Sequence, residues 1–257
     1  MPQPTVPGTT VRLLSQPSKM SCYSWSLPAA GAACPSMNGT ICAGCYATKG
    51  SYRYPSTEKA QQARWQWTRE SMRSAAAAAP WVQHMSNVII HKVLLSKAPK
   101  FFRIHDSGDF FNSTYTMAWL QVIREVNSYA VTHKLEPIKF WASTRRWQAA
   151  CRCPTSDSST TPAGTHFRIL SGDDRMMRAL QMLAAEPHVT IRPSALDFDA
   201  VAPILPGLAA GSGSLTPTAA PVLAQICPAS RNSSSCAAES CRHCWTNPSE
   251  PVYYLQH

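Results

Sequence analysis

Hydrophobic residues recur every three to four positions over several stretches of the chain, and this spacing predicts amphipathic helices. Ser56 or Thr57 beside Glu58 is a typical helix start, and Pro80 is expected to end the helix that begins there. Asn112 is expected to cap a later helix. The predicted helices span about 56–79, 81–95, 113–126 and 174–185.

Short runs of aromatic and β-branched residues lie between these helices, and their composition is typical of buried strands. The runs begin at Phe101, Ile138, Phe167 and Val189. Strands that alternate with helices indicate a parallel sheet, so we expect an α/β fold in the form of a partial (β/α) barrel. Polar residues follow each run, at the edge where such sheets place their functional sites.

Three cysteines fall within twelve residues of a turn-rich segment: Cys34, Cys42 and Cys45. The two residues between Cys42 and Cys45 allow a tight turn to aim both sulfurs at one ion, which suits zinc or an iron-sulfur cluster. Three thiols favour iron, because a 4Fe-4S cubane would keep one iron without a local ligand, whereas structural zinc requires four ligands. Cys22 is an alternative source of the fourth ligand.

Four more cysteines fall within eighteen residues near the C-terminus: Cys227, Cys236, Cys241 and Cys244. They form a complete four-thiolate set. The segment is too short to bury a core of its own, so a metal is expected to fold it. A second iron-sulfur cluster and zinc both remain open here.

The formal net charge of +10, from 24 basic and 14 acidic residues, indicates an anionic partner such as nucleic acid, or compensates for anionic clusters. No apolar leader follows Met1 and no stretch is long enough to span a membrane, so we expect an intracellular protein whose thiols bind metal. The expected organisation is a core (1–202), a linker or insertion (203–226) and a metal-binding tail (227–257) packed on the core.

The chain contains several motifs in a fixed order: Cys34-x7-Cys42-x2-Cys45-Tyr46-Ala47 with Gly50 and Tyr52, Arg103-Ile104-His105-Asp106-Ser107-Gly108-Asp109-Phe110, Cys227-Pro228-Ala229, and Cys241-x2-Cys244-Trp245. Together these motifs resemble the phage family called gene product 88. The first loop in turn looks like that of radical-SAM enzymes, which hold a 4Fe-4S cluster at the mouth of a partial (β/α) barrel. Those loops have three residues between the first two cysteines, and this chain has seven.

These resemblances imply a phage iron-sulfur protein in the cytoplasm of an infected cell, and a radical-SAM-like enzyme of unknown substrate. A small molecule would bind at the open iron, and S-adenosylmethionine is one candidate. His105, Asp106, Ser107 and Asp109 are the predicted ligand-fixing residues at the strand end. The alternatives are an electron-transfer protein and a nucleic-acid-binding module, the latter using the arginines and tryptophans between Arg64 and Arg73.

Overall fold

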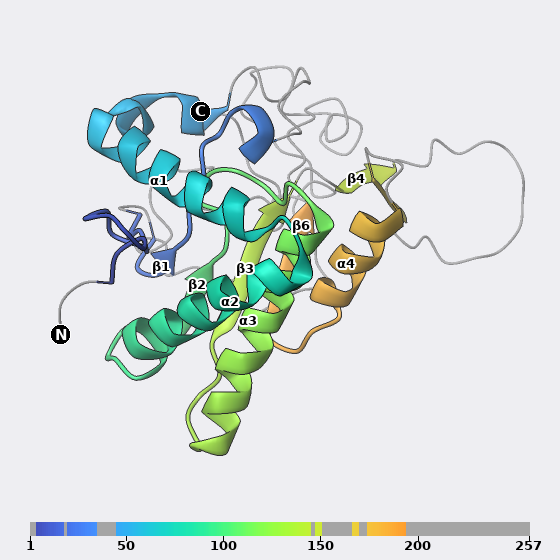
Figure 1. The fold of residues 1–257 in the computed structure, drawn as a ribbon. Coiled ribbons are helices and arrows are strands. Elements are labelled where there is room, and N and C mark those ends of the chain that lie inside the picture. Colours follow the sequence, from blue (N-terminus) through green and yellow to red (C-terminus); the bar gives the residue numbers. More distant parts are fainter. Residues whose placement is uncertain are drawn as a thin grey trace, which may run out of the picture.

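A parallel sheet forms the centre of the fold (Figure 1). The computed structural model describes residues 4–17, 20–34, 45–144, 147–150, 166–169 and 174–193. The strands lie in the order β1 (Tyr23–Ser24), β2 (Phe101–Arg103), β3 (Lys139–Thr144) and β6 (Val189–Pro193), and β1 is only a two-residue edge pairing beside three longer strands. Among the described residues β1 and β6 are opposite edges, so the predicted α/β class and parallel sheet are confirmed, but the sheet is open and not closed into a barrel.

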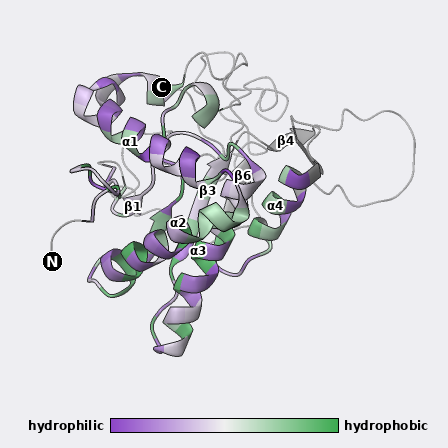
Figure 2. Cartoon of the chain, viewed as in Figure 1, coloured by the Kyte–Doolittle hydropathy of each residue, from purple (hydrophilic) through white to green (hydrophobic). Residues whose placement is uncertain are grey.

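Helices connect these strands. They are α1 (Pro55–Ser71), α2 (Ala75–Ile89), α3 (Ser113–Thr132) and α4 (Asp174–Ala184). Helices α2 and α3 pack side by side in front of the sheet in Figure 1, and α4 packs against α3 on the side of β6. Figure 2 shows α1 as more hydrophilic than α2, which agrees with its more exposed position. No helix in the described part of the chain is long and apolar enough to cross a membrane.

The predicted end of the first helix at Pro80 is wrong. The break falls at 72–74, because the side chain of Ser74 accepts a hydrogen bond from Ala77 N (3.2 Å) and starts α2 there. Pro80 lies within α2, where it removes one backbone hydrogen bond from an alanine-rich turn of high helix propensity. The cap at Asn112 is confirmed by its 2.8 Å hydrogen bond from Tyr115 N, although α3 runs six residues beyond the predicted end at Val126.

The run at Phe167 is a strand, as predicted, but it does not join the parallel sheet. It forms β5 (His166–Ile169), which pairs antiparallel with β4 (Trp147–Ala150). The sequence between these strands predicts no helix, and a parallel pairing needs a crossover connection. Antiparallel pairing of β4 and β5 is therefore simpler, because it requires no crossover.

Aromatic side chains fill the core between the sheet and the helices. Trp25, Trp81 and Trp119 are fully buried, and their rings meet edge to face with centroids 5.4 to 6.4 Å apart. Phe102 of β2 packs against Trp119 (5.9 Å) and against Phe140 of β3 (5.7 Å). This packing fixes β2, and therefore the loop that follows it, relative to the helices.

Candidate functional site

The polar loop His105–Asp109 follows β2 at the carboxyl end of the sheet, and it is buried despite its composition. Its backbone runs along the segment that leads to Cys34. Three hydrogen bonds join the two: Asp106 N to Trp25 O (2.9 Å), Leu27 N to Ser107 O (3.0 Å) and Asp109 N to Ala33 O (3.2 Å). The segment entering the first cysteine is thus fixed against this loop.

Gly108 allows this close approach. Its φ is +83°, in the region that favours glycine. A Cβ atom at this position would lie 2.7 Å from the Cβ of Leu27. The glycine of the predicted turn is therefore required by both backbone conformation and space.

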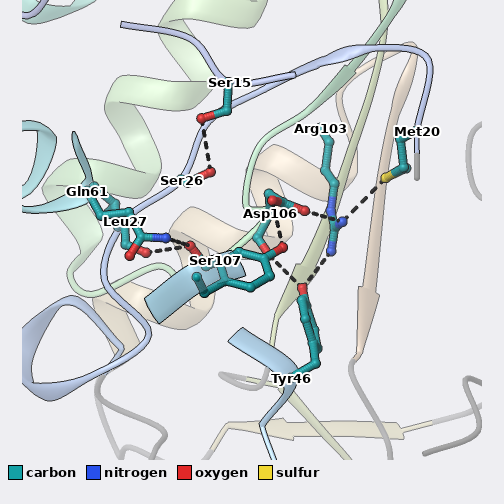
Figure 3. A network of polar contacts seen from close by, with 10 residues as sticks. Ser15, Met20, Ser26, Leu27, Tyr46, Gln61, Arg103, Asp106 and Ser107 are labelled. Atoms are coloured by element: carbon teal, nitrogen blue, oxygen red, sulfur yellow. Dashed lines mark hydrogen bonds and ion pairs between the residues drawn. The ribbon is translucent and has the colours of Figure 1, made fainter. Parts of the chain in front are cut away.

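The segment that leaves Cys45 meets the same loop from the other side (Figure 3). Asp106 is the common partner. Its carboxylate accepts hydrogen bonds from Arg103 Nη1 (2.6 Å, an ion pair) and from Tyr52 OH (2.8 Å). Its carbonyl oxygen accepts one from Tyr46 OH (2.5 Å), and Arg103 Nη2 donates to the same hydroxyl (3.0 Å).

The Arg103–Asp106 ion pair is largely buried, with 12% and 9% of the two side chains exposed. The guanidinium also lies over the ring of Trp141 (4.7 Å) and near Met20 Sδ (3.3 Å). Burial, followed by the charge of Asp106, raises the pKa of Tyr52, so its hydroxyl stays protonated and donates to the carboxylate.

Ser107 and Asp109 have described partners as well. Ser107 Oγ donates to Leu27 O (2.6 Å) and accepts from Gln61 Nε2 of α1 (2.8 Å). Asp109 Oδ1 accepts from Phe110 N and from Thr144 Oγ1, both at 2.7 Å. These contacts are those of a well-capped turn, and they tie the loop to α1 and to β3.

His105 is different, because one of its ring nitrogens has no partner among the described residues. Nε2 lies 3.1 Å from Tyr115 OH, the ring packs edge-on against Phe110, and Nδ1 is buried without a hydrogen bond. Burial, and then the positive charge of Arg103, lowers the pKa of His105 to about 3. The imidazole is therefore neutral at physiological pH.

Cys34 and Cys45 are both partly exposed, and their neighbours Ala33 and Tyr46 both contact the His105–Asp109 loop. Cys22 lies elsewhere. It precedes β1 and lines a small cavity with Ala98 and Pro99, which precede β2, so it lies at the amino end of the sheet.

The other predicted ligands fall outside the described residues: Cys42, Cys227, Cys236, Cys241 and Cys244. The predicted linker (203–226) and tail (227–257) lie outside them too. Within the described part of the chain, no three His, Cys, Asp or Glu side chains form a group that could hold a metal ion.

The model of the family described as Gene product 88 matches residues 6–247. The chain belongs to the Gene product 88 family. It is 48% identical over 54 residues to the Gene 88 proteins of Mycobacterium phages D29 and L5. Each match covers 21% of this chain and 19% of the relative, so the aligned part spans about a fifth of either protein. No solved structure matches the chain.

In this Gene product 88 protein, sequence reasoning gave no role to Arg103, Tyr46, Tyr52 or Gln61. Arg103 and Asp106 are three residues apart at the end of a strand, which was the available signal for an ion pair. Nothing local in the sequence indicates that Tyr46 and Tyr52 reach the same aspartate across more than 50 residues.

The predicted nucleic-acid surface on α1 of this family member is largely internal. Arg64 is buried and donates to Arg12 O (2.8 and 3.3 Å), and burial lowers its pKa to about 10. Trp65 packs edge-on against Phe111. Trp67 packs against the core. Arg69 is exposed on the helix and Arg73 is exposed just after its end, so this region presents charge to solvent but few rings on which bases could stack.

Proposed function

We propose that this protein binds a 4Fe-4S cluster through Cys34, Cys42 and Cys45 at the carboxyl end of its sheet. One iron would be held by no cysteine and would bind a small molecule. The observation that carries the proposal is that both flanks of the cysteine segment are hydrogen-bonded to one loop, so the segment begins and ends at the same place.

The residues present fit such a group. The donors are thiols, which suit iron-sulfur clusters, and Cys34 and Cys45 are partly exposed on the flanks of one short segment. The position of Cys22 at the amino end of the sheet, opposite the His105–Asp109 loop, supports an open iron, since that thiol is poorly placed to complete the cluster. The buried Nδ1 of His105 is a polar atom that an additional group could satisfy.

A bound cluster would supply an electron and an open coordination position for a ligand. Among the four predicted ligand-fixing residues, His105 is the one we assign to the ligand, because its neutral ring has a nitrogen without a described partner. Ser107 and Asp109 hold the loop through the contacts described above. With this arrangement we propose a radical-SAM-like redox enzyme on this open α/β sheet, with S-adenosylmethionine as the first ligand to test.

For the tail we propose a second centre on Cys227, Cys236, Cys241 and Cys244, either iron-sulfur or zinc. Cys241→Ser or Cys244→Ser should lose this metal and make the tail susceptible to limited proteolysis, because the segment has few apolar residues of its own. A variant that keeps its metal and resists cleavage like the parent would overturn the assignment.

The experiment for the open iron is electron paramagnetic resonance of the reduced, anaerobically reconstituted full chain. Adding S-adenosylmethionine or another small iron ligand should change the spectrum, and Cys22→Ser should leave the iron content and this response unaltered. If Cys22→Ser instead abolishes the cluster, the iron is not open and electron transfer replaces catalysis as the proposed function.

The net charge of +10 supports a second candidate, a nucleic-acid-binding module in the infected cell. Because the described basic residues on α1 lack exposed stacking partners, we expect any such binding to be weak and to fall steeply with added salt. Tight, sequence-selective binding at physiological salt would favour this module over the enzyme.

A further inference from the structure

We propose that Asp106 is a positioning residue that holds the exit of the cysteine segment, and with it the thiol of Cys45, against the sheet. This role was not predicted from the sequence, which placed Asp106 among the residues that contact the ligand. The consequence for a cluster rests on the function proposed above, but the mechanical role of Asp106 does not.

Three side chains from two parts of the chain contact this one residue, and two of them, Arg103 and Tyr46, are labelled in Figure 3. The carboxylate oxygens of Asp106 are divided between Arg103 and Tyr52, and its carbonyl oxygen binds the hydroxyl of Tyr46. Tyr46 and Tyr52 also pack edge to face, with ring centroids 5.6 Å apart. Both carboxylate oxygens are thus committed to protein partners, which suits a structural tie better than ligand contact.

The two flanks of the cysteine segment are held by different means. The entry, 25–33, is joined to the loop by backbone hydrogen bonds that survive most substitutions. The exit, Tyr46 to Arg53, is tied to this loop by two tyrosine hydroxyls: Tyr52 OH binds the carboxylate of Asp106, and Tyr46 OH binds its main-chain carbonyl. Substituting Asp106 removes the Tyr52 bond and the ion pair of Arg103, whose guanidinium also donates to Tyr46 OH, whereas the bonds to main-chain atoms remain. The exit should therefore loosen, and the entry should not.

This asymmetry can be measured in the metal-free full chain, independently of any cluster. Hydrogen exchange would be followed in peptides covering 25–33 and 46–53, and the rates of alkylation of Cys34 and Cys45 would be measured under reducing conditions. In Asp106→Asn we expect exchange at 46–53 and alkylation of Cys45 to rise about tenfold or more, the effect of losing charge-assisted hydrogen bonds. Exchange at 25–33 and alkylation of Cys34 should change by less than about twofold, since backbone bonds remain.

Tyr52→Phe removes one of these hydrogen bonds without leaving Arg103 unpaired, so it keeps the test open if Asp106→Asn folds poorly. Its expected effect has the same pattern at about fivefold. Tyr54→Phe is the matched control: Tyr54 is two residues away and 62% exposed, and the variant should behave like the parent.

The proposal is overturned if Tyr52→Phe leaves exchange at 46–53 unchanged, or if both flanks loosen equally. Iron uptake by the same variants then separates the two proposals. If the exit loosens but the parent protein takes up no iron, the tie stands and the iron-sulfur function fails. If the parent takes up iron and the exit does not loosen, the function stands and the tie fails.

Discussion

The apolar core and the polar edge of the sheet are stabilised in different ways. Between β2 and the helices, Phe102, Trp81 and Trp119 pack by shape and exclude water. After β2, the residues His105 to Asp109 are almost as deeply buried but are polar, and burying such groups costs free energy unless each finds a partner. Burial of the apolar core explains why the chain folds. It does not explain why polar residues are buried at the end of the sheet, and a functional site there would explain it.

The largest loss of stability is expected from a substitution in the apolar core. Trp119→Ala should destabilise the protein by about 3 to 5 kcal/mol, because it removes a fully buried ring that contacts other buried rings. Urea unfolding of the metal-free chain measures this loss, and Val131→Ala, at a side chain that is 70% exposed, is the control. Iron bound per folded chain should be unchanged, and a selective loss of iron would show that core and edge are not separable.

A pH titration of stability probes the edge through His105. Its folded pKa of about 3 lies below the ordinary value of 6.5, so between these values the unfolded chain binds more protons. The contribution of His105 to the free energy of unfolding is fully present above pH 6.5. It falls as the pH drops toward 3, and the loss is roughly 3 kcal/mol at pH 4.5. His105→Gln should flatten this part of the metal-free protein's stability profile, and an unchanged slope would contradict the assignment.

Gly108→Ala tests the contact between the loop and the entry of the cysteine segment. We expect a loss of roughly 2 kcal/mol, from the positive φ together with the clash against Leu27. Gly8→Ala is a matched control, because Gly8 has a similar φ of +74° with nothing within 4 Å of the added Cβ. Thermal unfolding should show the smaller loss for Gly8→Ala, and equal losses would mean that the close approach contributes nothing.

The smallest effect is expected where α1 meets the loop. Gln61→Ala removes the hydrogen bond to Ser107 and should cost about 1 kcal/mol in chemical unfolding. Gln62→Ala, at an exposed position of the same helix, should cost less than half as much. If the two variants are equally stable, the Gln61–Ser107 contact does not hold the loop.

Sequence patterns predicted the elements of this fold better than their connections. The strand at Phe101, the cap at Asn112 and the helix at 174 depend on local propensity, and all three are confirmed. The break before α2 was missed because a capping serine competed with a proline for the boundary. The pairing of β5 was missed because a strand's composition does not specify its partner.

At the candidate site, the sequence predicted which residues lie at the strand end but not what they contact. His105 to Asp109 were found because polar residues after a parallel strand mark a functional edge. Tyr46 and Tyr52 were given no role, because their approach to Asp106 is a tertiary contact between segments more than 50 residues apart. Only the tertiary structure shows that His105 differs from Asp106, Ser107 and Asp109 in having a polar side-chain atom without a described partner.

The most direct test of the central claim is a count of iron, acid-labile sulfide and zinc in the anaerobically reconstituted full chain. It should be made beside a variant in which Cys34, Cys42 and Cys45 are all serine. The account predicts a brown parent protein that contains sulfide, and a variant that loses about four irons, the content of one cubane. A colourless parent with zinc and no sulfide, or a variant that keeps all its iron, would contradict it.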